Sequence, residues 1–185
     1  MSIQSVAIIG LGLLGGSVGL AIQEHAGEIA TKGYDRDANV RARAGDRDLV
    51  GEVCNTAADA VNGSDLVVLC VPVGAMEASA AEIEPHLAPG TIISDVGSSK
   101  ESVAKALAKV LPGHTIIPAH PVAGTEQSGP DAGFASLFTN RWCILTPPQG
   151  ADEKAIAELS EFWTKLGAKV DLMDAKHHDL VLCIH

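Results

Sequence analysis

Long apolar runs are missing from this sequence. No uninterrupted hydrophobic stretch approaches the roughly 18 residues that a membrane-spanning helix requires. The N-terminal residues also lack the basic start of a secretory signal peptide, and their apolar stretch runs directly into a glycine turn. We therefore expect neither a transmembrane span nor an export signal, and we predict a cytoplasmic protein without a membrane partner.

Closely spaced cysteine pairs are also missing. The four cysteines occur singly within apolar surroundings, and no CxxC spacing is present: Cys54, Cys70, Cys143 and Cys183. This pattern favours buried, reduced thiols in a cytosolic protein over disulfides or a metal site, which are the alternatives. No bound metal is predicted.

Basic clusters are absent as well. Thirteen basic side chains stand against twenty-three acidic ones, which gives a formal net charge of −10. Binding of nucleic acid depends on many cationic contacts to phosphates, so this balance argues against nucleic acid as the main partner. A small anion held in a local pocket remains compatible with it.

Short β-type runs alternate along the chain with longer helix-type runs. Hydrophobic residues make up 46% of the sequence, which is enough for a buried core. Strands are predicted at 6–9, at a run ending at 33–34, and at 66–71, 91–94, 115–118, 142–145 and 169–172. Helices are predicted near 14–23, 38–44, 75–86, 100–110 and 152–166.

The alternation predicts an α/β fold of Rossmann type, with a doubly wound, mostly parallel sheet. Runs such as 66–71 are apolar at consecutive positions, which indicates that helices cover both faces of the sheet. We expect residues 1–174 to form a dinucleotide-binding domain. Residues 175–185 are interpreted as the start of a longer helix, because no glycine or capping signal ends it.

A glycine-rich turn follows the first predicted strand directly. Its GxGxxG pattern consists of Gly10, Gly12 and Gly15, and Leu13 and Leu14 lie between the last two glycines. The first glycine permits the tight turn, the second lets the backbone approach a pyrophosphate, and the third lets helix and strand pack closely. The free N–H groups of the helix start then face the anion. These five residues are predicted to bind a dinucleotide.

An acidic residue supports this prediction. Asp35 follows twenty residues after Gly15, at the end of the second strand, where a carboxylate can bind both ribose hydroxyls. It would repel a 2′-phosphate, so NAD is expected as cofactor. Arg36 keeps NADP possible because it can reach such a phosphate, although it can equally be a solvated surface charge. Val71 and Pro72, at the end of a later strand, are predicted to lie near the adenine ribose and pyrophosphate.

Two polar clusters follow later strands and are expected at the same edge of the sheet as the glycine loop. Asp95-Val96-Gly97-Ser98-Ser99-Lys100 is the first, and His120-Pro121-Val122-Ala123-Gly124-Thr125-Glu126 begins the second. A dehydrogenase acting on an alcohol needs a group that accepts the hydroxyl proton, and a neutral histidine can do this near neutral pH. His120 is the candidate for that role. Lys100 is interpreted as a backbone hydrogen-bond donor at its helix start.

Taken in order, the segments GLGLLGGS, DVGSSK, HPVAGTEQSG and KHHD resemble the prephenate/arogenate dehydrogenase family. The HPVAGTEQSG segment is the most specific of the four. The resemblance implies oxidative decarboxylation of prephenate to 4-hydroxyphenylpyruvate, or of L-arogenate to L-tyrosine, with NAD(P) as hydride acceptor. Aromatisation of the ring after loss of CO₂ would make the step effectively irreversible.

The resemblance also assigns roles to individual residues. His120 matches the histidine that polarises or deprotonates the ring hydroxyl, and Ser98 matches the serine that assists it. Glu126 is expected to close or shape the substrate pocket, or to hold its own loop through a structural hydrogen bond. Asp179 resembles a position lining the substrate site. Family members continue into an all-helical domain that dimerises and contributes arginine to the substrate carboxylates. This domain is absent here, so a homodimer is expected only for the complete protein.

Two other functional classes remain as alternatives. Another Rossmann-fold enzyme, such as a 3-hydroxyacid dehydrogenase or a pyrroline-carboxylate-type reductase, also starts with a glycine turn, but the HPVAGTE segment has no evident purpose there. A non-catalytic NAD-binding module would retain the glycine loop and Asp35 and make no demand on His120. The choice between prephenate and arogenate stays open.

Overall fold

The structure, a computed structural model, describes residues 3–123 and 129–182. Within this part of the chain the main sheet is six-stranded and parallel throughout. From edge to edge it contains β3 (Glu52–Val53), β2 (Ala30–Tyr34), β1 (Ser5–Ile9), β4 (Leu66–Leu69), β5 (Ile92–Asp95) and β6 (Thr115–Ile116). The chain proceeds from β1 outward to β3 and then returns to the other side of β1, where β4 begins the second half of the sheet. This strand order is that of a Rossmann-type sheet, so the predicted fold class is confirmed.

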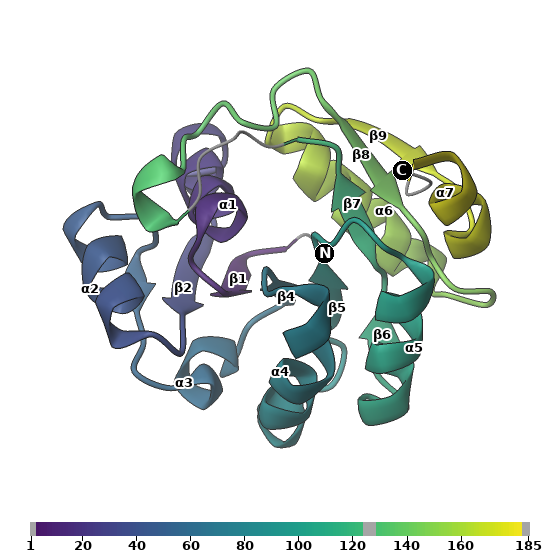
Figure 1. The fold of residues 1–185 in the computed structure, drawn as a ribbon, viewed down its shortest axis with the longest axis horizontal. Helices are drawn as coiled ribbons and strands as arrows, with labels where there is room; N and C mark the ends of the chain where they lie inside the picture. Colours follow the sequence, from purple (N-terminus) through teal and green to yellow (C-terminus); the bar gives the residue numbers. More distant parts are fainter. Residues whose placement is uncertain (1–2, 124–128, 183–185) are drawn as a thin grey trace.

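Helices cover both faces of the main sheet. Figure 1 shows α1 and α6 above the sheet and α3, α4 and α5 below it. The helices are α1 (Leu13–His25), α2 (Ala38–Asp46), α3 (Ala57–Val61), α4 (Met76–Ile83), α5 (Glu101–Val110), α6 (Glu153–Lys165) and α7 (Ala175–Leu182). Single 3₁₀ turns occur at η1 (Val73–Ala75), η2 (Glu84–His86) and η3 (Pro130–Ala132).

The consecutive apolar residues of the central strands explain this arrangement. Successive side chains of a strand point to opposite faces. Val6 and Ile8 of β1 therefore pack in a core with α1 and α6, whereas Ala7 and Ile9 pack in a second core with α3 to α5. The prediction that both faces are covered is confirmed.

A second, smaller sheet was not predicted. It contains β7 (Ala119–Pro121), β8 (Trp142–Leu145) and β9 (Lys169–Leu172), with β7 antiparallel and β9 parallel to β8. The predicted strand at 115–118 therefore belongs to the main sheet only through β6. Pro118 has no N–H group with which to extend the main ladder. Its carbonyl instead accepts a hydrogen bond from the N–H of Thr146, and the chain crosses into the second sheet.

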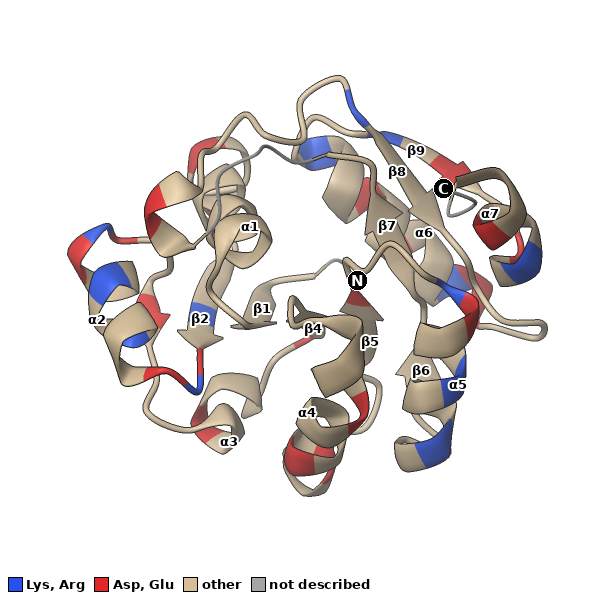
Figure 2. Ribbon diagram, in the orientation of Figure 1, with Lys and Arg blue, Asp and Glu red and all other residues tan. Residues whose placement is uncertain are grey.

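Aspartates start two of the helices. The carboxylate of Asp37 accepts a hydrogen bond from the N–H of Asn39 at the start of α2, and that of Asp152 accepts one from Lys154 at the start of α6. Both are typical N-caps. Charged residues of both signs are interspersed over the outer helices, as Figure 2 shows for α2, α5 and α6. Within the described residues, no helix is both long and apolar enough to cross a membrane.

Candidate functional site

The glycine loop joins β1 to α1 and leaves no room for side chains at two positions. Gly10 has a positive φ of 100°, and a Cβ there would lie 2.4 Å from the carbonyl oxygen of Cys70. A Cβ at Gly15 would lie 1.8 Å from the carbonyl oxygen of Gly10. Gly12 differs, because beyond its own chain neighbours no atom of the described residues lies within 4 Å of the position of a Cβ there. The fold therefore requires the first and third glycines, and the second leaves open space beside the backbone.

The start of α1 faces that space. Gly12 is the N-cap of the helix, no side chain caps it, and its first turn contains no acidic residue. The first N–H groups of a helix have no partner within the helix and attract anions. The loop therefore has the backbone donors that a pyrophosphate needs.

Asp35 is fixed beside the loop by backbone donors. One carboxylate oxygen accepts from the N–H of Leu11 at 2.9 Å, and the other accepts from the N–H of Asp37 at 2.9 Å. The guanidinium of Arg41 donates to the carbonyl of Asp35 at 2.8 Å and lies 5.7 Å from the ring centre of Tyr34. The carboxylate is thus held in place at the end of β2, as expected for a ribose-binding acid.

Two adjoining cavities lie along the loop and share Gly12, Cys70, Val71 and Pro72 in their walls. The first, of about 360 Å³, is lined by residues of the loop, of β2 and of α4, including Gly10, Asp35, Arg36, Ala78, Ser79 and Glu82. The α4 residues were not predicted. The sequence indication for these residues was that α4 directly follows the strand that ends near Val71.

The second cavity, of about 450 Å³, brings together the other predicted residues. Leu13 and Leu14 line it from α1, Ser98 from the segment after β5, and His120 from β7. The sequence expectation that Ser98 and His120 share an edge with the glycine loop therefore agrees with the structure. His120 lies within β7 of the second sheet, however, and not directly at the end of a strand of the main sheet.

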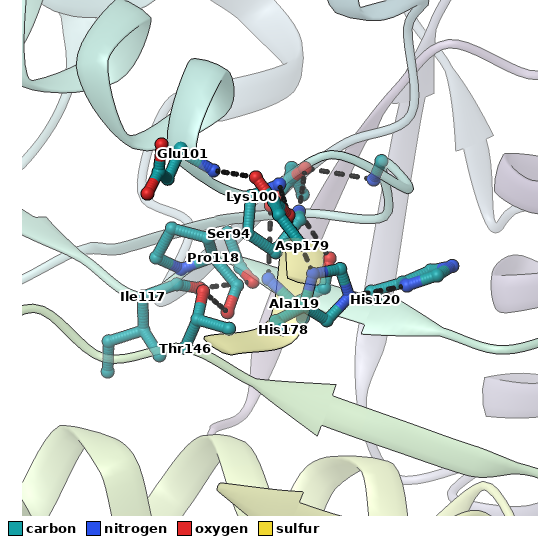
Figure 3. A network of polar contacts seen from close by, with 12 residues as sticks. Ser94, Lys100, Glu101, Ile117, Pro118, Ala119, His120, Thr146, His178 and Asp179 are labelled. Atoms are coloured by element: carbon teal, nitrogen blue, oxygen red, sulfur yellow. Dashed lines mark hydrogen bonds and ion pairs between the residues drawn. The ribbon is translucent and has the colours of Figure 1, made fainter. Parts of the chain in front are cut away.

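His120 belongs to a row of three polar side chains, seen in Figure 3. Its Nδ1 lies 2.8 Å from Nε2 of His178, and Nδ1 of His178 lies 2.8 Å from a carboxylate oxygen of Asp179. His178 is fully buried on α7, and the two imidazoles meet edge to face. Figure 3 shows the other ring nitrogen of His120 pointing away from His178. The pair of histidines joins segments 58 residues apart.

Asp179 was predicted to line the substrate site. In the structure its two oxygens accept hydrogen bonds from the N–H groups of Lys100 and Glu101, at 2.8 and 3.0 Å, at the start of α5. Partial burial acts to raise the pKa of Asp179, but these N–H groups and His178 outweigh it and hold the pKa below its ordinary value. Among the described residues that line the two cavities, Asp179 does not occur. Glu126, the other predicted substrate residue, lies outside the described residues.

A buried ion pair holds the backbone next to His120. Nζ of Lys100 donates to a carboxylate oxygen of Asp95 at 2.6 Å and to the carbonyl of Ala119 at 2.7 Å. The other oxygen of Asp95 accepts from the N–H of Ala119 at 3.0 Å. Both charged side chains are inaccessible to solvent. Lys100 does bind backbone, as interpreted from the sequence, but that backbone belongs to β7 and its main partner is Asp95.

Burial shapes the acid–base properties of this region. It lowers the pKa of His120 to about 4, and the nearby His178 and Lys100 act in the same direction. Burial also raises the pKa of Asp95 and lowers that of Lys100, while their mutual attraction opposes both shifts. His120 is therefore neutral near pH 7 and able to accept a proton.

The sequence interpretation of buried thiols holds for two of the three cysteines that the structure describes. Cys54, Cys70 and Cys143 are free thiols, of which Cys54 and Cys143 are buried and Cys70 is partly exposed. Cys183 lies outside the described residues.

Most of the chain is similar to a known protein family. Residues 18–172 match the family model described as prephenate dehydrogenase, nucleotide-binding domain. The chain is 46% identical over 181 residues to the cyclohexadienyl dehydrogenase of Zymomonas mobilis. This match covers 98% of this chain and 62% of that protein. The chain thus spans less than two thirds of this relative.

Two solved structures are similar to this chain in both fold and sequence. Prephenate dehydrogenase from Aquifex aeolicus, solved in complex with hydroxyphenyl propionate and NAD⁺, is 28% identical with a TM-score of 0.90. The match covers 98% of this chain and 63% of that one. Arogenate dehydrogenase from Synechocystis is 28% identical with a TM-score of 0.88, and the match covers 96% of this chain and 62% of that one.

Proposed function

The chain belongs to the prephenate dehydrogenase family, and we propose that it is the cofactor-binding part of an enzyme that oxidatively decarboxylates prephenate or L-arogenate. The observation that carries the proposal is His120. A neutral histidine with a lowered pKa lines a cavity that continues along a glycine loop and an uncapped helix start. A hydride-transferring dehydrogenase needs this combination of a proton acceptor and a dinucleotide cradle.

The cofactor would lie along the loop. The α1 N–H groups and the open space at Gly12 suit a pyrophosphate, Asp35 suits the ribose hydroxyls, and Val71 and Pro72 form the wall between the two cavities. NAD is the proposed cofactor because Asp35 would repel a 2′-phosphate. NADP remains the second candidate because Arg36 lines the same cavity. When bound, the cofactor accepts the hydride.

The residues of this chain would manage one proton. His120 would take the proton of the ring hydroxyl on Nε2, the ring nitrogen that does not face His178, as hydride leaves the carbon that bears this hydroxyl. Ser98, which lines the same cavity, would hold the hydroxyl in position. Loss of CO₂ from the resulting dienone would then move the electron pair of the broken bond to the carbonyl oxygen, and return of the proton from His120 would give the phenol. The product is 4-hydroxyphenylpyruvate from prephenate or L-tyrosine from arogenate. Half-burial of His120 limits competing water.

Two predicted substrate residues receive different roles in this proposal. Glu126 keeps its proposed role at the edge of the substrate pocket, on the strength of its place in the HPVAGTEQSG segment. Asp179 is proposed to act on the substrate only through His178 and His120, because both of its oxygens are engaged by α5 and one of them also by His178.

The wider organisation is part of the proposal. Residues 1–174 would form the cofactor-binding domain, and residues 175–185 would begin a helix leading to a helical domain through which the complete protein forms a homodimer. The support is that the chain spans about 62% of the Zymomonas relative. The three free cysteines of the described chain fit a cytoplasmic location.

Steady-state kinetics of the complete protein test this function. Prephenate and L-arogenate are each supplied with NAD and with NADP, and reduced cofactor is followed by absorbance while the aromatic product is identified chromatographically. We expect turnover of at least one of the two substrates. Turnover only of hydroxyacids would support the 3-hydroxyacid dehydrogenase alternative, and NAD binding with no turnover would support the binding module.

A further inference from the structure

Asp179 can only accept hydrogen bonds in its row with the two histidines. Its oxygens already accept from two backbone N–H groups at the positive end of the α5 helix dipole, which favours the ionised form. A carboxylate has no proton to donate. Nδ1 of His178, 2.8 Å away, therefore donates to it.

The proton on Nδ1 of His178 determines which nitrogen of His120 carries a proton. A neutral imidazole that carries its proton on Nδ1 has a lone pair on Nε2. Nε2 of His178 lies 2.8 Å from Nδ1 of His120, so with a neutral His178 the donor between them is Nδ1 of His120. The lone pair of a neutral His120 is then on its Nε2, the nitrogen that points away from His178 in Figure 3.

We propose that His178 and Asp179 are positioning residues that select the tautomer of His120 in which Nε2 accepts the substrate proton. This inference rests on the proposed function for its catalytic meaning, because only a dehydrogenase of an alcohol needs that lone pair. The arrangement follows the general logic by which a carboxylate orients a catalytic imidazole, with one further histidine inserted between them.

The surrounding charges are compatible with this arrangement. Lys100, the N-cap of α5, is paired with Asp95 of β5, and the charge of Lys100 still acts to lower the pKa of His120. From α7, His178 contacts His120 directly, and Asp179 contacts His178 on its other side. When His120 accepts a proton, Nδ1 keeps its donor role towards His178, and the charge of Asp179 favours the imidazolium.

Replacing Asp179 by Asn changes the hydrogen-bonding groups at this end of the row while keeping the shape of the side chain. The amide oxygen can still accept from the N–H group of Glu101. An amide nitrogen in the place of the oxygen that faces His178 loses the hydrogen bond from Lys100 and would donate to Nδ1 of His178. The proton of His178 would then move to Nε2, and that of His120 would move from Nδ1 to Nε2. In the complete protein we expect Asp179→Asn to lower kcat by about 10²-fold with little change in KM. Asp171→Asn, an exposed charge change on β9, is the matched control.

His178 is tested by a removal and a rescue. His178→Leu fills the buried position with an apolar side chain and deletes the acceptor for Nδ1 of His120. His178→Gln places an amide oxygen near the position of Nε2 and restores that acceptor. We expect kcat to fall by about 10-fold or more in the Leu variant and to recover in large part in the Gln variant. A merely structural role would make both variants alike.

The tautomer itself is measured by long-range ¹H–¹⁵N correlation of histidine-labelled protein, which distinguishes a protonated ring nitrogen from one with a lone pair. We expect His120 protonated at Nδ1 in the unaltered protein and at Nε2 in Asp179→Asn. A proton on Nε2 of His120 in the unaltered protein would overturn the inference, as would an unchanged tautomer and rate in both Asp179→Asn and His178→Leu. Because this readout needs no turnover, it decides the inference even if neither substrate is oxidised, a result that would reject the proposed function alone.

Discussion

The two halves of the candidate site differ in the chemical groups that form them. The cofactor half is mainly backbone, in which two glycines permit a turn and the helix start supplies N–H donors within a few consecutive residues. The His120 half consists of side chains from β5, the N-cap of α5, β7 and α7, held together by buried polar contacts. A local segment can specify the first half. The second exists only once the whole domain has folded.

The largest effect on activity should come from replacing His120 in the second half of the site. His120→Asn in the complete protein should lower kcat by about 10²-fold to 10⁴-fold, because it removes general base catalysis, and should leave KM nearly unchanged. Ser98→Ala should cost less. Because burial lowers the pKa of His120 to about 4, activity should fall only as pH drops through about 4, where the base becomes protonated.

The kcat/KM profile checks this assignment. The unaltered protein should lose activity on the acidic side near pH 4 and not near the ordinary histidine value of about 6.5. The His120→Asn variant should lack that acidic limb. An unchanged rate and limb in the variant would place the proton acceptor elsewhere.

The next largest effect should come from the ion pair that holds β7. Lys100→Met leaves the carboxylate of Asp95 buried without its partner, which should lower the free energy of unfolding by about 3–5 kcal/mol. Denaturant unfolding measures this change. The control is Lys109→Met, whose exposed pair with Glu77 should contribute at most about 1 kcal/mol. Replacing both partners, as Asp95→Leu with Lys100→Met, should recover much of the loss, and failure to do so would point to overpacking.

These two halves also differ in how far the sequence predicted them. The glycine loop and Asp35 were predicted in detail because each function depends on a residue type at a fixed spacing. The ion pair was not, although Asp95 and Lys100 flank a strand end where apolar neighbours make an unpaired charge costly. The partnership of His120 with His178 joins distant segments, and only the adjacent His-His-Asp on one helix hinted at it. Pro118 marked the change of sheets, but its consequence depends on Thr146.

Gly12 offers a test that separates the cofactor from the fold. An added Cβ meets no atom of the described part of the chain, so Gly12→Ala should change the free energy of unfolding by no more than about 1 kcal/mol. The same methyl group would occupy the space proposed for the pyrophosphate, so the NAD dissociation constant should rise by roughly 10-fold to 100-fold. Titration calorimetry measures it, with Gly45→Ala on α2 as control. Unaltered affinity would mean that the dinucleotide does not approach this loop.

The smallest effect expected is a change of cofactor preference at Asp35. Asp35→Ser removes the carboxylate that would bind ribose hydroxyls and repel a 2′-phosphate, so NAD affinity should fall and discrimination against NADP should relax, each by about 10-fold. Asp37→Ser makes the same charge change two residues away and keeps a good N-cap for α2, so it should change neither. Adding Arg36→Ala to Asp35→Ser should abolish the gained NADP affinity if Arg36 meets the phosphate, because it lines the same cavity. If Asp35→Ser preserves the original preference, the contacts from Leu11 and Asp37 would explain this carboxylate as a structural support of the loop, and the choice of cofactor would have to be made elsewhere in the cavity.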